Sequence, residues 1–184
     1  VFYAHSKSRH SNREIDQQLP TSGFDFFGGG MFEEPIAENY NMFKLLQDNN
    51  YTLITSSDSL QCVPSLNTKI CVLHPNTRLD LEIDNSDDKF TLAALTESAI
   101  KKLDNENGFF MMIEGGMIDW ACHSNDAAAA AREVVGFNEA IKKAVEFYNA
   151  HPDETLIVIT ADHETGGLAL GTARFPYFSN ISLL

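Results

Sequence analysis

Apolar residues occur along the chain in two alternating patterns, which are short continuous runs and longer stretches with helical spacing. The continuous runs have the length of strands, and they cover residues 24–27, 51–55, 70–73, 109–113 and 155–160. The last two runs are apolar nearly throughout. Continuous apolarity predicts strands buried on both faces, as in a parallel sheet.

Amphipathic stretches separate these runs. Helical spacing predicts helices over residues 35–49, 90–103 and 127–149, whereas residues 75–89 are polar and indicate a loop. Asn125 or Asp126 can cap the start of the third helix. Strands alternating with helices predict an α/β fold, in which a mostly parallel sheet has helices on both faces. We expect one domain over residues 1–184.

Composition excludes several classes of protein. The chain of 184 residues carries a net charge of −13, which argues against nucleic-acid binding because phosphate contacts need a basic surface. No apolar run reaches the roughly 18 residues of a membrane span. Three cysteines are too few for a disulfide scaffold, although Cys62 and Cys71 could be bridged or free.

Residues with metal-binding chemistry directly follow the two most apolar runs. Glu114, Asp119 and His123 follow the first run, and Asp162 and His163 follow the second. Parallel strands present their carboxyl ends at one edge of a sheet, and carboxylates with imidazoles suit Zn²⁺. Either cluster alone could consist of helix caps and surface charges. Both clusters together favour a metal centre.

Several motifs in order resemble the alkaline phosphatase family, in the form with DHETGG. They are F-Y-A-H-S-K-S-R at 2–9, G-F-D-F-F-G-G-G at 23–30, G-F-F-M-M-I-E-G-G-M-I-D-W-A-C-H at 108–123, N-D-A at 125–127 and T-L-I-V-I-T-A-D-H-E-T-G-G at 155–167. The resemblance implies two zinc ions and one magnesium ion. It assigns Asp119 and His123 to the first zinc, Asp162 and His163 to the second, and Glu114 to magnesium.

The same resemblance implies hydrolysis of phosphate monoesters through a phosphoserine. Arg9 matches the arginine that holds the substrate phosphate, which suits a planar guanidinium. The family's nucleophilic serine, in a D-S-A motif, has no counterpart here, because Asp58-Ser59-Leu60 shares only its first two letters and reads as a turn. The histidine that completes the first zinc site also has no counterpart.

We therefore expect an internal fragment of a longer enzyme that is inactive alone, holds metals incompletely and self-associates. The resemblance further implies a periplasmic or extracellular protein that forms homodimers and binds a phosphate monoester or inorganic phosphate. Two alternatives stay open. One is a related phosphodiesterase or sulfatase-like hydrolase, and the other is a non-catalytic metal-binding fragment.

Overall fold

The computed structural model describes residues 2–62, 68–84 and 90–167. Contacts divide the chain into two compact units. The first unit comprises residues 1–79 and 88–111, and the second comprises residues 80–87 and 112–184. The expectation of one domain over residues 1–184 stays a prediction.

The first unit is built on a three-stranded parallel sheet. Its strands are β1 (Phe26–Gly29), β4 (Tyr51–Ile54) and β5 (Lys69–Leu73), in the order β1-β5-β4. β5 is central and pairs in register with both neighbours, so that Cys71 lies opposite Phe27 and Leu53. These strands were expected from the three apolar runs at 24–27, 51–55 and 70–73, and the structure confirms them.

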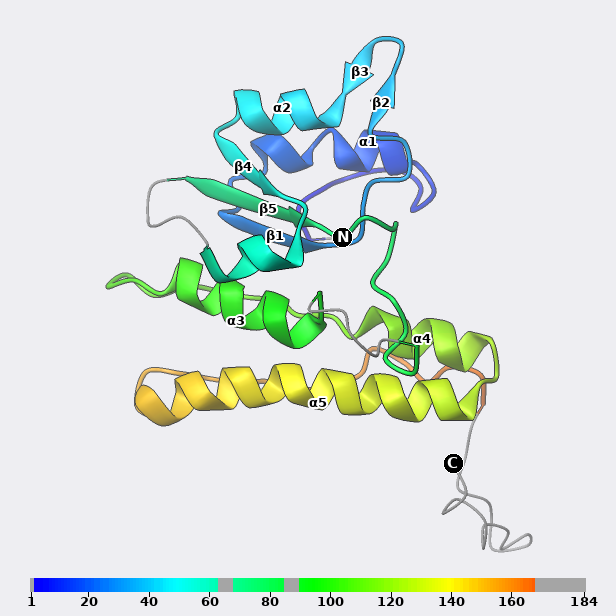
Figure 1. Ribbon diagram of the computed structural model, residues 1–184, viewed down its shortest axis with the longest axis vertical. Helices are drawn as coiled ribbons and strands as arrows, with labels where there is room; N and C mark the ends of the chain where they lie inside the picture. Colours follow the sequence, from blue (N-terminus) through cyan, green and yellow to red (C-terminus); the bar gives the residue numbers. More distant parts are fainter. Residues whose placement is uncertain (1, 63–67, 85–89, 168–184) are drawn as a thin grey trace, which may run out of the picture. The chain divides into compact units, whose positions relative to one another are not determined.

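Helices cover both faces of this sheet (Figure 1). Side chains of β5 alternate, so that Cys71 and Leu73 join one core cluster and Ile70 and Val72 join the other. The first cluster includes residues of α2 (Met42–Asp48), and the second includes Leu95 of α3 (Leu92–Leu103). The predicted α/β class is therefore confirmed. This unit also contains the short elements α1 (Asn12–Asp16), η1 (Leu19–Thr21) and η2 (Ser57–Cys62).

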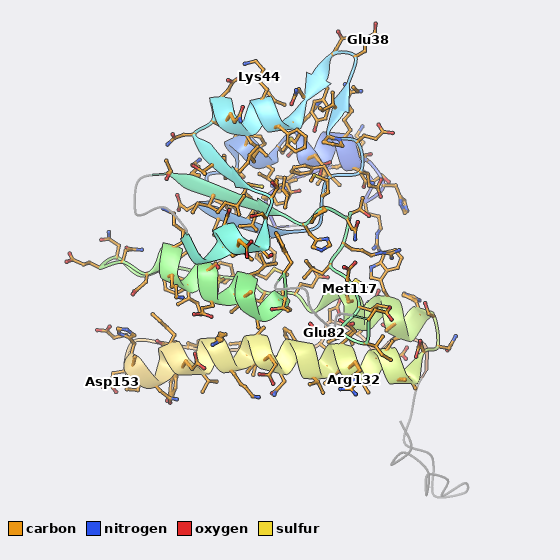
Figure 2. All side chains as sticks on the ribbon, viewed as in Figure 1. Glu38, Lys44, Glu82, Met117, Arg132 and Asp153 are labelled. Carbon is orange, nitrogen blue, oxygen red and sulfur yellow. The ribbon has the colours of Figure 1, made fainter. Side chains whose placement is uncertain are left out.

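The helix expected over residues 35–49 is wrong in its first half. There β2 (Ile36–Ala37) and β3 (Tyr40–Asn41) form an antiparallel hairpin, with Glu38 at its turn (Figure 2). The N–H of Met42 donates to the carbonyl of Pro35, and the Asn41 side chain accepts a bond from the N–H of Lys44. The helix therefore begins at Met42. In a helix that began earlier, the N–H of Lys44 would bond to a backbone carbonyl of the preceding turn, but here it bonds to the Asn41 side chain.

The second unit contains two packed helices, α4 (Gly116–His123) and α5 (Ala127–Ala150). Small side chains at Ala121, Ala129 and Ala130 form the buried contact between them. The Asp126 side chain caps α5 by accepting from the N–H of Ala129, at 2.9 Å. α5 and its cap were expected from the sequence, whereas α4 was not.

The strands expected at 109–113 and 155–160 do not form paired strands within the described residues. Both runs are irregular, and Phe110, Leu156 and Val158 are 69%, 87% and 75% exposed. A continuous apolar run becomes a strand only where neighbouring strands bond its backbone and cover both faces. Neither run has such neighbours in the part of the chain that is described.

Two smaller expectations concern the cysteines and the membrane. Cys71 is a free and fully buried thiol, and burial raises its pKa to about 12. Therefore Cys71 is a core side chain rather than half of a bridge to Cys62.

Among the described helices, none is long and apolar enough to cross a bilayer.

Candidate metal centre

α4 presents Asp119 and His123 one helical turn apart. Residues at positions i and i+4 lie on the same face of a helix, so the two side chains face each other. Asp119 Oδ2 and His123 Nε2 are 3.6 Å apart, and both side chains are accessible to solvent. This distance is too long for a hydrogen bond.

Asp162 and His163 form a second pair in the loop 161–167. Asp162 Oδ1 accepts a bond of 3.1 Å from the N–H of His163, which orients the carboxylate. Its Oδ2 atom lies 3.6 Å from His163 Nε2. The two pairs therefore have the same composition and the same separation of oxygen and nitrogen.

The separations fit two ligands of one zinc ion. Atoms bound to a tetrahedral zinc at about 2.0–2.1 Å are about 3.4 Å from each other. Both pairs, at 3.6 Å, come close to this value. However, zinc in proteins takes three or four protein ligands, and among the described residues no three such side chains gather at a common point. Each pair thus fits an ion in part.

The tautomer of His163 suits a ligand. Its Nδ1 atom lies 2.7 Å from the carbonyl oxygen of Glu164. Because a carbonyl only accepts, Nδ1 carries the proton, and the Nε2 lone pair is left for an ion. The bond to Glu164, followed by the charge of Asp162, raises the pKa of the imidazole.

A single hydroxyl connects the two pairs. Thr165 Oγ1 donates to Asp119 Oδ1 at 2.7 Å and lies 3.1 Å from His163 Nδ1. The loop that carries Thr165 packs on the end of α4, where Gly166 adopts a φ of +75° and its backbone meets the carbonyl of Cys122. A side chain at Gly166 would collide with that carbonyl, so glycine permits the approach.

Two further residues were predicted for the site, Glu114 and Arg9. Glu114 is exposed just before α4 and makes no hydrogen bond to Asp119, His123, Asp162 or His163 in the described structure. Arg9 is exposed in the turn before α1 and belongs to the other unit. Their assignments to magnesium and phosphate stay predictions.

Sequence reasoning missed the connecting role of Thr165 and the packing role of Gly166. The signal that could have found them is the Thr-Gly-Gly that follows Asp162-His163-Glu164. A glycine pair after a ligand-bearing segment indicates a close backbone approach, but its partner depends on the tertiary fold.

Comparisons with known proteins agree on one family. The family model described as alkaline phosphatase matches residues 33–182. Alkaline phosphatase 4 of Bacillus subtilis is 33% identical over 179 residues, which are 93% of this chain and 38% of the relative. The repressible alkaline phosphatase of Saccharomyces cerevisiae is 30% identical, with 96% of this chain and 29% of the relative covered.

Solved structures give the same answer. The cold-active alkaline phosphatase of a psychrophilic Shewanella species matches with a TM-score of 0.74 and 31% identity, over 83% of this chain and 37% of its own. The enzyme of the Antarctic bacterium TAB5 matches with a TM-score of 0.72 and 28% identity, over 82% and 44%. A variant of the TAB5 enzyme, in which glutamate replaces one histidine, is described with Mg bound in its M3 site. This chain thus spans less than half the length of each of these proteins.

Proposed function

Because the chain belongs to the alkaline phosphatase family, we propose that it is the part of a phosphate monoesterase that holds the metal ions and the substrate phosphate. The observation that carries this proposal is the pairing of Asp119 with His123 and of Asp162 with His163, connected through Thr165. The nucleophile in this proposal is a serine outside residues 1–184.

Each pair would contribute two ligands to one zinc ion. The donor types support this assignment, since neutral imidazole and carboxylate are both zinc ligands. Zinc, when bound, would supply Lewis-acid charge for the phosphoryl oxygens. Glu114 would bind magnesium, which prefers oxygen ligands.

The protein side chains would then bind and orient the ester. Arg9 would form paired hydrogen bonds to two phosphate oxygens, because its planar fork matches their geometry. The bond from His163 Nδ1 to the Glu164 carbonyl would keep the ring nitrogen Nε2 unprotonated towards the ion. Asp162 Oδ1, held by the backbone N–H of His163, would keep its other oxygen directed to the same place.

Location and assembly complete the proposal. We place the parent protein in the periplasm or outside the cell, as a homodimer, on the family resemblance. We expect no hydrolysis by the 184-residue chain alone, since none of its residues matches the nucleophilic serine.

The test measures the rate of substrate hydrolysis by the full-length protein that the gene encodes. Aryl phosphate should be hydrolysed much faster than the corresponding aryl diester or aryl sulfate. Asp162→Asn should reduce this rate at least about 100-fold, because charge stabilisation by a metal is worth several kcal/mol. Asp153→Asn, at an exposed site next to the end of α5, is the control. Faster hydrolysis of the diester or sulfate, or full activity of Asp162→Asn, would contradict the proposal.

A further inference from the structure

We propose that Thr165 is a positioning residue that couples the two metal-ligand pairs, and that its hydroxyl acts mainly on the Asp119–His123 pair. This inference rests on the proposed function. Thr165 itself need not touch an ion or the substrate.

The hydroxyl of Thr165 has one proton and can accept hydrogen bonds at its lone pairs. At 2.7 Å from Asp119 Oδ1, it donates that proton to the carboxylate. At 3.1 Å from His163 Nδ1, the same oxygen can only accept, because Nδ1 carries a proton that is shared with the Glu164 carbonyl. The chain of bonds therefore runs from the His163 ring through the hydroxyl to Asp119.

This arrangement selects which atoms remain for an ion. With Oδ1 of Asp119 bonded to Thr165, the atom directed to His123 Nε2 is Oδ2. With Nδ1 of His163 bonded, the atom near Asp162 is Nε2. Partners that orient metal ligands in this way typically change metal affinity 10- to 100-fold.

The two pairs differ in how much they depend on Thr165. His163 has a second bond, to the Glu164 carbonyl, and Asp162 is held by a backbone N–H. No other hydrogen bond to the Asp119 side chain is present among the described residues, and His123 lies beside its second oxygen. Loss of the hydroxyl should therefore release Asp119 and leave the Asp162–His163 pair in place.

The loop does not need the hydroxyl to stay on α4. The backbone at Gly166 packs directly against the carbonyl of Cys122, one residue beyond Thr165. Removal of the hydroxyl thus leaves this backbone contact intact. Thr165→Val tests the hydroxyl because valine keeps the shape, and Thr165→Ser tests whether a hydroxyl alone restores the effect.

The experiment has one arm without metal and one with zinc, both on the 184-residue chain. In the metal-free chain, Thr165→Val should shift the side-chain carboxyl ¹³C signal of Asp119 and the ring ¹⁵N signals of His163. Thr165→Ser should leave both near their original positions. Thr160→Val is the matched control, since within the described residues the Thr160 hydroxyl bonds to the carbonyl of Ala161 next to it and not to a ligand pair.

In the zinc arm, competition with a chromogenic chelator measures the affinity of each pair. Thr165→Val should weaken zinc binding at Asp119–His123 about tenfold and change binding at Asp162–His163 less than about twofold. Equal affinities in Thr165→Val and the original chain, or unchanged Asp119 signals without metal, would overturn the inference alone. If the original chain binds no zinc while the metal-free signals shift as expected, the proposed metal function fails and the positioning role fails with it.

Discussion

The backbone N–H of Glu82 donates a hydrogen bond of 2.7 Å to the buried Glu133 carboxylate of α5. The Glu82 side chain, labelled in Figure 2, occupies the space that a Cβ at Gly136 of the same helix would need. Two acidic side chains are thereby brought together where the segment 80–84 crosses α5. This contact has consequences for stability at different pH values.

Stability should fall as the pH rises past the ordinary pKa of these carboxyls. Desolvation raises the pKa of both Glu133 and Glu82 above the ordinary value of 4.5. The bond from the Glu82 N–H offsets part of this rise for Glu133, and the neighbouring charges of Glu82 and Glu139 add to the rise for Glu133 and Glu82, respectively. A carboxyl with a raised folded pKa binds its proton more tightly in the folded state. Its contribution is therefore complete below the unfolded pKa and is lost as the pH rises through the folded pKa.

Substitution of Glu133 tests this directly. Glu133→Gln keeps an oxygen that can accept from the N–H of Glu82 but removes the titration, so urea unfolding should depend less on pH as the pH rises above the ordinary carboxyl pKa of 4.5. Glu133→Ala removes the acceptor as well and should destabilise the chain by about 1 kcal/mol. An unchanged pH profile in Glu133→Gln would contradict the assigned cause.

Stability should require glycine at position 136 only because the Glu82 side chain fills the space of a Cβ there. A Cβ at Gly136 would come within 2.6 Å of Glu82 Cγ, so Gly136→Ala should destabilise the chain by about 1 kcal/mol or more. In a Glu82→Ala background the same substitution should stabilise α5 by up to about 1 kcal/mol, because alanine favours a helix over glycine. Thermal unfolding of the original chain, the two single variants and the double variant measures the coupling free energy between the two positions. Equal effects of Gly136→Ala in both backgrounds would refute it.

The two glycines after Thr165 should differ in their effect on the site. Both have positive φ, +75° at Gly166 and +68° at Gly167, so alanine is strained at either position. Among the described residues, a Cβ at Gly166 would meet the carbonyl of Cys122, whereas a Cβ at Gly167 would meet nothing within 4 Å. Gly166→Ala should displace the loop and abolish the ¹⁵N coupling pattern of a His163 ring bonded at Nδ1, whereas Gly167→Ala should preserve it. The reverse order would show that backbone strain, not the contact, decides.

The glycines at the end of β1 offer a similar contrast in the first unit. A Cβ at Gly30 would collide with the backbone of Thr77, but a Cβ at Gly29 would meet nothing within 4 Å. Gly30→Ala should therefore cost about 1–3 kcal/mol, since backbone yields less readily than a side chain. Gly29→Ala should be close to neutral. Denaturant unfolding of the two variants measures both effects. If Gly30→Ala left the free energy of unfolding unchanged, the predicted collision with Thr77 would be wrong.

Much of the fold follows from local patterns. β4, β5 and α3 were expected from apolar spacing, since each buries residues that its periodicity places on one side or both. α5 was also expected, but it buries small side chains such as Ala129 and Ala140, whereas Val134 of its apolar spacing is exposed. The hairpin before α2 was missed because the cap at Asn41 and the bond from Met42 to Pro35 outweigh helical spacing. The runs at 109–113 and 155–160 show the limit of pattern alone. Apolarity favours a strand, but pairing needs a neighbour.

The candidate site was predictable in its ligand types and not in its connections. Asp119 and His123 were expected from their position after an apolar run, and their facing arrangement follows once Gly116–His123 is helical. The bond from Thr165 to Asp119 spans 46 positions in the sequence. It depends on how the loop packs on α4, which no local pattern specifies.

The most direct test of the account counts the zinc ions bound by the chain and by two variants in equilibrium dialysis. We predict two weakly held zinc ions per chain, because each pair supplies two ligands where zinc usually takes at least three. Asp119→Ala should remove one ion and Asp162→Ala the other. Binding of no zinc by the original chain, or an unchanged count in both variants, would contradict the assignment of these pairs as the two halves of one metal centre.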